Sequence, residues 1–448
     1  MPGGTVLDDL NESQRRAATA DAAALLVVAG AGTGKTRTLV ARLACLLERG
    51  VAPERLLLLT FSRRAAAEML SRVGRFCGEE AARVQGGTFH AVAAHQLRRH
   101  AGLLGLPPGF SVMDASDSTE MLRLVREELG LGHRQRRFPR PETLAAICSR
   151  TVSTQSPLEE VVARHFPWCA GELEGIRDVL AGAAARKASQ GMLDYDDLLV
   201  AWLVALRSGA LRVAFDHVLV DEYQDTNCLQ VGIVEALAGL PGSQGPPGSQ
   251  GPPGSQGQRG AALTAVGDDS QAIYGFRGAS PRGMREFERR FPAASVVRLE
   301  DSYRATPPLV HLANAVIGRA RSGLPKRLRA VRAGSRLPDL VTCADEAAQA
   351  DAVCRAVLEH REEGWRLCDQ AVLFRSGPHS DLLEVELGRR GIPFVKYGGL
   401  RFLESAHVKD LLALLRVLDN PRDELAWFRA LSACEQVGPA TARSLLET

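Results

Sequence analysis

The stretch that most constrains this chain is ALLVVAGAGTGKT, residues 24–36, together with the sequence that follows it. Residues 25–28 are an apolar run, the next residues are rich in glycine, and TRTLVARLACLLERG then has the pattern of a helix that ends at Gly50. A short apolar run predicts a buried strand, and glycine permits a tight turn after it. The stretch therefore predicts a strand, a glycine loop and a helix in direct succession.

A loop of this kind binds phosphate. Its backbone N–H groups and the helix N-terminus surround the β-phosphate of a nucleotide, Lys35 reaches the β- and γ-phosphates, and the Thr36 hydroxyl can ligate Mg²⁺. The usual pattern GxxxxGK[ST] has glycine where this chain has Ala29, so the match is imperfect. A glycine-rich turn without a ligand is the less favoured alternative. The predicted phosphate-binding residues are Ala29, Gly30, Ala31, Gly32, Thr33, Gly34, Lys35 and Thr36.

A second apolar run, residues 218–220, ends in DEYQDTN. A strand that delivers two carboxylates opposite a phosphate loop places Asp221 to hold the Mg²⁺ shell and Glu222 to orient and deprotonate water. Alone, such an acidic pair most often belongs to a solvated loop. Beside the phosphate loop it predicts a site for nucleotide hydrolysis.

A third segment, LTAVGDDSQAIYGFRGA, covers residues 263–279. It predicts another buried strand followed by acidic residues, a glutamine and two aromatic residues. Tyr274 and Phe276 would most often be core residues, but here their neighbours are glycine, serine and arginine. Aromatic faces beside a cation stack nucleic-acid bases without reading their sequence. The segment therefore predicts a platform for a single strand.

The composition is that of a globular protein of several domains, with 448 residues, 45% of them hydrophobic and 24% charged. Nine cysteines are scattered without a CxxC pair, so neither a zinc cluster nor a disulfide framework is indicated. No basic and apolar leader opens the chain, and no window approaches the roughly 18 apolar residues of a membrane span. We expect a cytoplasmic protein. Its net charge of +3 is too small to indicate a polyanionic partner.

Residues 239–260 contain a collagen-like run with near-copies of GSQGPP. A triple helix needs glycine at every third position over a long stretch, and this run is too short. Because loop-closure entropy rises slowly with length, a fold tolerates such an expansion in a surface loop. We interpret the run as a passenger, that is, an insertion without a function of its own. A linker-like or partner-binding loop is the minor alternative.

The acids of LDYDDLL, residues 193–199, also have two interpretations. Asp194, Asp196 and Asp197 could form a functional carboxylate cluster. Acidic residues at the start of a helical stretch more often serve the helix N-terminus, which is the interpretation we favour.

Taken together and in this order, the motifs resemble those of superfamily 1 DNA helicases of the UvrD, PcrA and Rep type. LNESQRRA, residues 10–17, is similar to the family's Q motif, which implies that Gln14 reads adenine. AGAGTGKTR is similar to the family's own phosphate loop and adds Arg37 to the nucleotide site. LLLTFSRRAAAEM and GTFHA resemble segments that touch single-stranded DNA, which implicates Phe61, Arg63 and His90.

The later motifs extend the resemblance. VGDDSQAIYGFRGA implies that Gln271 lies near the γ-phosphate and that Tyr274 and Phe276 stack on bases. LEDSYRAT, residues 299–306, resembles the family's LEQNYRST, which implies that Tyr303 stacks on adenine and that Arg304 is an arginine finger. The implied cofactors are ATP and Mg²⁺. The implied catalytic residues are Lys35, Glu222, Gln271 and Arg304.

The resemblance also implies an α/β fold with a RecA-like parallel sheet and a division into domains. Residues 1–104 and 191–280 would form motor domain 1A, and residues 105–190 a helical 1B insertion. Residues 281–377 would form the first part of a second RecA-like domain, 2A, and residues 378–448 the start of a helical 2B insertion.

The function that the resemblance implies is an ATP-dependent 3′–5′ DNA helicase or single-stranded DNA translocase in DNA repair or replication, acting on single strands and junctions with 3′ tails. The family's GLEF-type and TRA segments occur nowhere in this chain. We therefore expect a chain that is C-terminally truncated relative to the family and lacks the second arginine finger and the rest of 2B and 2A. The alternative is a nucleotide-dependent DNA-binding module without motor activity, with self-association or a partner supplying the missing half.

Overall fold

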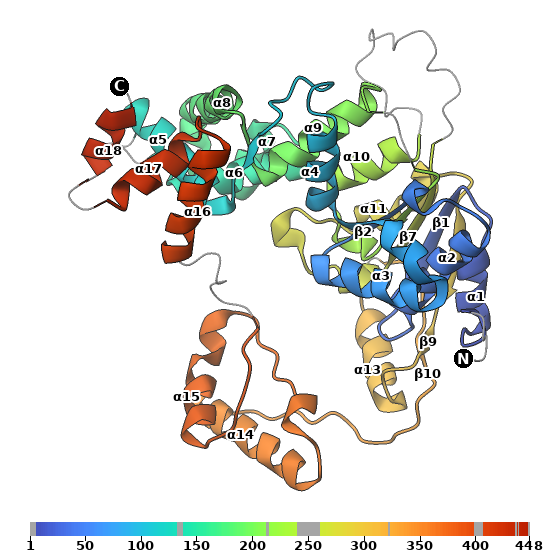
Figure 1. Cartoon of the computed structure of the whole chain (residues 1–448). Helices are drawn as coiled ribbons and strands as arrows, with labels where there is room; N and C mark the ends of the chain where they lie inside the picture. Colours follow the sequence, from blue (N-terminus) through green and yellow to red (C-terminus); the bar gives the residue numbers. More distant parts are fainter. Residues whose placement is uncertain are drawn as a thin grey trace. The chain divides into compact units, whose positions relative to one another are not determined.

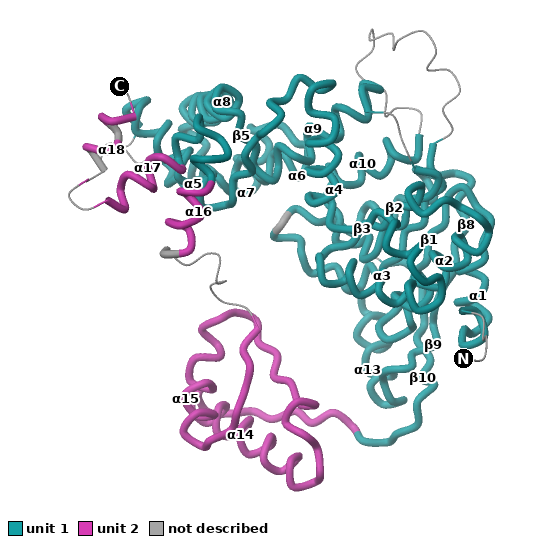
Figure 2. The backbone as a smooth tube through the Cα atoms, viewed as in Figure 1, with its two compact units in different colours: residues 1–336, 416–425 teal, residues 337–415, 426–448 magenta. Residues whose placement is uncertain are grey.

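The computed structural model describes residues 6–131, 138–211, 215–239, 260–320, 323–397, 406–434, 437 and 439–446. The repeats of the collagen-like run lie outside the described residues, so their interpretation as a passenger stays a prediction. The chain divides into two compact units, one of residues 1–336 with 416–425 and one of residues 337–415 with 426–448 (Figure 2).

The first unit is built on a six-stranded sheet with the order β3-β2-β6-β7-β1-β8, in which every pair of neighbours is parallel (Figure 1). All residues of β1 and β2 are buried, as expected for strands covered on both faces. The three strands expected from the apolar runs are present as β1, β6 and β7. The strand bounds are β1 Ala24–Ala29, β2 Leu56–Thr60, β3 Gln85–Thr88, β6 His217–Val220, β7 Ala262–Gly267 and β8 Ser295–Leu299.

Helices cover both faces of this sheet. Leu25 and Val27 of β1 pack into one core with α1 (Glu12–Thr19), α2 (Lys35–Glu48) and α3 (Arg63–Cys77). The alternate residues Leu26 and Val28 pack into a second core with three other helices, which are α4 (Phe89–Arg99), α9 (Tyr195–Arg207) and α10 (Cys228–Leu237). Side chains alternate between the faces of a strand, so one strand serves both cores. The predicted α/β parallel-sheet fold is confirmed.

A helical insertion has a core of its own. It consists of α5 (Ala115–Glu128), α6 (Pro141–Thr154), α7 (Leu158–His165) and α8 (Leu173–Gln190), with the short strands β4 (Ser111–Val112) and β5 (Met192–Leu193) at its two ends. Leu425 belongs to the same apolar cluster, and Asn420 donates to Ser111 Oγ at 3.2 Å. A segment far along the chain therefore completes this core.

The acids of the LDYDDLL stretch serve a helix N-terminus, as we expected. Asp194 is the N-cap of α9 and accepts from the backbone N–H of Asp197 at 2.8 Å, while Asp197 accepts from that of Asp194 at 2.9 Å. Lys187 neutralises both carboxylates, with its Nζ 2.6 Å from Asp194. The cluster is a capping box with a buried counter-charge.

Residues 281–336 belong to the first compact unit. They supply β8 to the six-stranded sheet, next to β1. The assignment of residues 281–377 to the family's domain 2A, like the other domain bounds, stays a prediction. The remaining elements of this stretch are α11 (Arg282–Arg285), α12 (Phe287–Arg290), β9 (Asp301–Ser302), α13 (Pro307–Ile317) and β10 (Arg329–Ala330).

The second unit has a small core between α14 (Glu346–Glu362) and α15 (Asp381–Arg389), where Cys354 and Leu387 are buried. The last helices of the chain are α16 (Ala406–Asp419), α17 (Glu424–Ser432) and α18 (Pro439–Leu446).

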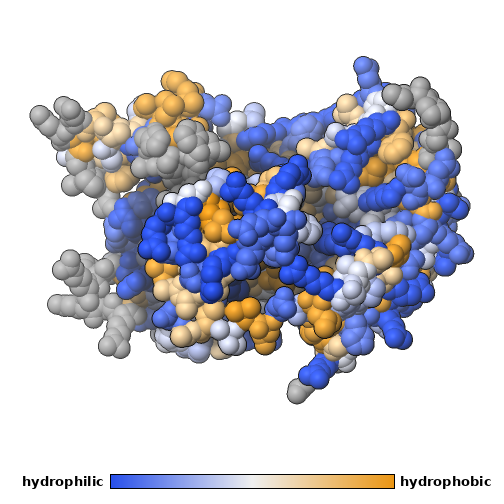
Figure 3. Space-filling model, turned by 90° about the horizontal axis from the view of Figure 1, so that it is seen from below, coloured by the Kyte–Doolittle hydropathy of each residue, from blue (hydrophilic) through white to orange (hydrophobic). Residues whose placement is uncertain are grey.

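Figure 3 shows one face of the molecule, on which apolar patches lie among hydrophilic residues. Within the part of the chain that the structure describes, no helix has the length and apolar character needed to cross a membrane.

Candidate functional site

The loop between β1 and α2 has the conformation that its glycines permit. Gly32 and Gly34 have φ values of 74° and 82°, in the left-handed region that favours glycine. A Cβ at Gly32 would lie 2.5 Å from the Cβ of Arg304, and one at Gly34 would lie 2.6 Å from Nε2 of Gln14. Two residues predicted to contact nucleotide thus pack directly on the loop.

Gln14 is held by the N-terminus of α1. Its backbone N–H donates to Asn11 Oδ1 at 2.8 Å, and its Oε1 accepts from the Asn11 backbone at 3.0 Å. Its Nε2 donates to the carbonyl of Thr33 at 2.9 Å. The side chain is buried, and the capping box together with the bond to Thr33 fixes its amide beside the phosphate loop.

Asn11 was not among our predicted residues. Besides capping α1, it donates through Nδ2 to the hydroxyl of Tyr303 at 2.9 Å and to Asp301 at 3.2 Å. An asparagine three residues before a glutamine is a readable capping signal. Nothing local in the sequence indicates its contact with Tyr303.

The predicted adenine-stacking residue and arginine finger both lie beside the phosphate loop. The backbone N–H of Tyr303 donates to the carbonyl of Gly32 at 2.9 Å, and Ser302 Oγ donates to that of Ala31 at 3.0 Å. Tyr303 and Arg304 are exposed. Two hydrogen bonds therefore join Ser302 and Tyr303 to the loop, directly before Arg304.

Arg42 fixes the helix that carries Lys35 and Thr36. Its buried guanidinium donates to Thr264 of β7 at 2.7 Å and to the carbonyl of Ala20, after α1, at 2.9 Å. Burial, and then the charge of Arg49, lower its pKa to about 10. A single side chain thus ties α2 to the sheet and to the end of α1.

The end of β6 brings the two predicted carboxylates to the loop. Lys35 Nζ lies 2.7 Å from Glu222 Oε2, and Gln224 donates to the same oxygen at 2.8 Å. Glu222 has φ 48°, a left-handed conformation that costs a residue with a Cβ about 1 kcal/mol or more. Strain of this kind clusters at functional sites, which supports the role predicted for Glu222.

Asp221 has the properties of a cation ligand. Its Oδ1 is buried and finds no hydrogen-bond donor among the described residues. Burial, followed by the charge of Glu222, raises its pKa to about 6, and the same two causes raise the pKa of Asp225 to about 6. A divalent cation beside Asp221 would relieve this unfavourable burial of charge.

The residues present suit Mg²⁺. Thr36 and Asp221 line the same cavity. No group of three His, Cys, Asp or Glu side chains forms a metal site within the described ranges. Mg²⁺ does not require one, since it commonly takes one or two protein oxygens and completes its shell with phosphates and waters.

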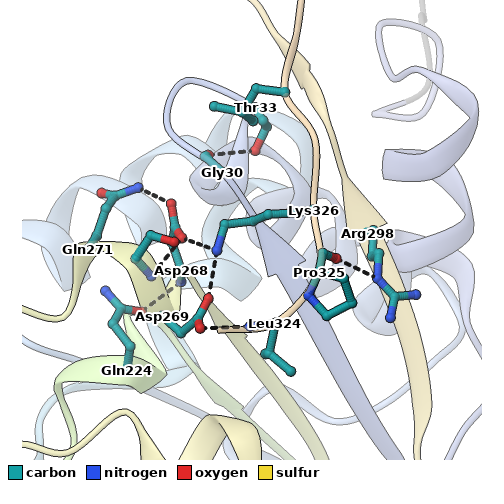
Figure 4. Close-up of polar contacts among 12 residues, drawn as sticks. Gly30, Thr33, Gln224, Asp268, Asp269, Gln271, Arg298, Leu324, Pro325 and Lys326 are labelled. Carbon is teal, nitrogen blue, oxygen red and sulfur yellow. Dashed lines mark hydrogen bonds and ion pairs between the residues drawn. The ribbon is translucent and has the colours of Figure 1, made fainter. Parts of the chain in front are cut away.

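A buried ion-pair cluster holds the turn after β7 (Figure 4). Lys326 Nζ lies 2.7 Å from Asp268 and 2.6 Å from Asp269, and all three side chains are at most 5% exposed. Gln271 donates to Asp268 at 2.6 Å, and Asp268 donates through its backbone to Gln224 at 2.9 Å. Hydrogen bonds thus connect Glu222, through Gln224, to the turn that leads to Tyr274.

Three of the aromatic residues predicted to bind DNA form a ladder. The ring centroids of Phe61 and Tyr274 are 4.6 Å apart, and those of Tyr274 and Phe276 are 5.9 Å apart. Phe61 is 43% exposed and Phe276 is 60% exposed, so both retain faces for bases. We call these three residues the aromatic ladder.

The other predicted contacts are exposed or interact with other side chains. His90 packs edge-on against Tyr195 at 5.6 Å, and burial lowers its pKa. Arg63 is exposed at the start of α3. Arg37, predicted to bind nucleotide, forms an ion pair with Asp9 at 2.8 Å.

One cavity of about 420 Å³ joins the two halves of the predicted site. Thr36, Asp221 and Glu222, which we predict to hold Mg²⁺ and to activate water, belong to its lining. Phe61 and Tyr274, which we predict to bind DNA, line it as well, together with Gln271. Residues predicted from separate motifs, for hydrolysis and for DNA binding, therefore surround a single space.

Comparisons with known proteins show which family the chain is similar to. Residues 10–292 match the UvrD/REP helicase N-terminal domain, and residues 297–448 match the UvrD-like helicase C-terminal domain. The chain is 37% identical over 447 residues to ATP-dependent DNA helicase UvrD1 of Mycobacterium tuberculosis, covering 96% of this chain and 55% of the relative.

Two further relatives have similar identities to this chain and similar coverage. DNA helicase II of Escherichia coli is 32% identical over 434 residues, which cover 95% of this chain and 56% of the relative. ATP-dependent DNA helicase PcrA of Staphylococcus epidermidis is 29% identical over 448 residues, which cover 98% and 58%. The chain thus spans a little over half the length of the curated relatives it matches. On the domain matches and the shared motifs, it belongs to the UvrD/Rep family of helicases.

Proposed function

We propose that this chain hydrolyses ATP in the cavity between the phosphate loop and β6 and couples hydrolysis to 3′–5′ movement along single-stranded DNA, and so to unwinding in DNA repair or replication. The observation that carries the proposal is the shared cavity, which is lined by the strained Glu222, by Asp221 with an Oδ1 that has no described donor, and by Phe61 and Tyr274. The direction of movement and the process rest on the family resemblance.

The chemistry follows from the side chains around the loop. Thr36 and Asp221 would hold Mg²⁺, which when bound neutralises charge on the terminal phosphates. Lys35 would exchange its ion pair with Glu222 for the β- and γ-phosphates. Glu222, freed from that pair, would orient and deprotonate the attacking water. Arg304 would stabilise the charge that develops on the γ-phosphate.

A series of hydrogen bonds that begins at Glu222 would couple ATP hydrolysis to the movement of DNA. Glu222 contacts Gln224, Gln224 contacts Asp268, and Asp268 contacts Gln271. Gln271 would leave Asp268 for the γ-phosphate when nucleotide is bound. That exchange would shift the turn that carries Tyr274, and the bases stacked on it would move with it.

The alternative is a nucleotide-dependent DNA-binding module without motor activity. The phosphate loop and the aromatic ladder would suffice for it, because binding a nucleotide and stacking bases do not require hydrolysis. Motor activity would then depend on self-association or on a partner chain.

ATP hydrolysis by the purified chain, with and without oligothymidylate, separates the two functions. Glu222→Gln serves as the blank because it keeps the shape of the side chain and removes its charge. DNA-stimulated turnover that the blank lacks supports the motor. Nucleotide binding with turnover equal to that of the blank refutes the motor and supports the binding module.

A further inference from the structure

A second cavity is lined in part by the turn that carries Phe276. Its volume is about 480 Å³, and it is lined by α6 and α7 of the helical insertion, by the start of α10 and by residues between 275 and 282. Nothing in the sequence motifs indicates it, because its walls come from segments that are far apart in the chain. We call it the basic cavity.

The lining of the basic cavity is cationic. Arg150 and Arg164 contribute from the insertion and Arg282 from the start of α11, with His165 beside them. The carboxylate among the described lining residues is that of Glu160. The hydroxyls of Ser156 and Ser280 add hydrogen-bond donors, whereas the Thr154 hydroxyl already donates to the carbonyl of Arg150 at 2.7 Å.

The three arginines are not held in ion pairs. None of Arg150, Arg164 and Arg282 forms an ion pair with a described residue, whereas many other arginines of the first unit do. The charge of Arg282 lowers the pKa of Glu286, but the two side chains form no ion pair. The pKa of His165 is lowered by burial and then by the charges of Arg150 and Arg164. Cations that crowd one another around a cavity attract an anion.

The basic cavity begins where the aromatic ladder ends. Arg150 donates to the backbone carbonyl of Phe276 at 3.2 Å, and the flanking residues Gly275 and Gly278 line the cavity. A strand that stacks a base on Phe276 therefore has its backbone within reach of the cavity mouth. Arginine and hydroxyl groups are the usual donors to backbone phosphates.

We propose that the basic cavity binds a phosphate of the single-stranded DNA backbone next to the base stacked on Phe276. The proposal rests on the proposed function, since it assumes that the aromatic ladder stacks bases. In this proposal Arg150, Arg164 and Arg282 contact the DNA backbone. The helical insertion therefore takes part in binding the strand.

The first test measures the salt dependence of DNA binding. A fluorescein-labelled oligothymidylate is titrated with the full chain over a series of salt concentrations, and the binding constant is read from anisotropy. Each lost phosphate contact lowers the slope of log K against log salt by about 0.7 for a single strand. We expect a reduction of this size or more in Arg164→Gln/Arg282→Gln and an unchanged slope in the control Arg16→Gln, which alters an exposed arginine of α1.

The outcomes are distinguishable. A double variant with the slope and affinity of the wild type overturns this inference and leaves the proposed function standing. A wild-type chain that binds no oligothymidylate overturns both. Circular dichroism melting of the double variant shows whether it is folded.

A second test needs no folded variant, because Cys228 is exposed and lines the basic cavity. We expect oligothymidylate to slow its alkylation by N-ethylmaleimide in the wild-type chain, as read by mass spectrometry. Cys343 and Cys368, which are exposed in the second unit, are internal controls whose rates should not change. Equal rates at Cys228 with and without DNA contradict the inference. Protection by inorganic phosphate but not by oligothymidylate would identify a free anion as the ligand and overturn the assignment to DNA.

Discussion

Lys326 offers the sharpest test of the electrostatics of the site. Its side chain is 5% exposed and neutralises Asp268 and Asp269, which are 4% and 1% exposed. Lys326→Met keeps an unbranched side chain of similar length and removes only the charge. Removing one partner of a buried ion pair typically costs about 3–5 kcal/mol, because the remaining charge stays buried without compensation. Arg285, 3.6 Å from Asp269, offsets part of this, so we expect a loss of about 3 kcal/mol.

The loss should depend on pH. Burial alone would raise the pKa of Asp269, but hydrogen bonds from Lys326 and Leu324 and the charges of Lys326 and Arg285 outweigh it and lower the pKa. In the wild type this carboxylate therefore stabilises the fold above its ordinary pKa of about 3.9, and the stabilisation is lost as pH falls through the lowered value. Without Lys326, burial makes the folded state bind the proton more tightly. The deficit of the variant should then grow from acidic to neutral pH.

Hydrogen exchange read by mass spectrometry on peptides of β7 measures the effect within the first unit. A loss of about 3 kcal/mol corresponds to roughly a hundred-fold faster exchange at neutral pH. Arg55→Met removes an exposed ion pair with Asp216 and should cost no more than about 1 kcal/mol. Exchange in Lys326→Met no faster than in Arg55→Met, or a deficit that is the same at acidic and neutral pH, would refute the reasoning.

Three further predictions concern the nucleotide site. Because the pKa of Asp221 is raised to about 6, protons should compete with Mg²⁺ for this carboxylate below that pH. Mg²⁺ binding, measured by calorimetry in the presence of an ATP analogue, should therefore weaken below about pH 6. Asp221→Asn should remove most of this pH dependence. Arg42→Met leaves Thr264 and the buried carbonyls that Arg42 contacts without a donor. The free energy of unfolding, measured with urea, should therefore fall by about 3 kcal/mol. A loss below about 1 kcal/mol would contradict the anchoring role of Arg42. Asn11→Ala removes the cap of α1 and the hydrogen bond to Tyr303, so it should weaken the binding of a fluorescent ATP analogue several-fold. Tyr303→Phe keeps the aromatic ring and should weaken binding less. Equal affinities for the wild type and Asn11→Ala would rule out this positioning role of Asn11.

Local motifs were sufficient to predict the elements of the site. The run from Ala24 to Thr36 contains its own strand, turn and helix signals, and the structure has β1, the loop and α2 there. The same holds for the strand that ends at Asp221 and for the cap formed by Asp194. These elements were predictable because apolar periodicity, glycine and capping residues act within a few neighbouring positions.

The tertiary structure alone decided which distant residues meet. Lys326 is a lone lysine in an irregular stretch, and its burial follows only from its approach to Asp268 and Asp269. Likewise, Arg150 and Arg282 line one cavity although the sheet and the insertion bring them from different regions of the chain. Such contacts depend on strand order and on charges that become strong only when water is excluded, and neither is written in a local pattern. The sequence thus determined the chemical groups and their local frames, and the fold decided which of them share a charge, a cavity or a hydrogen bond.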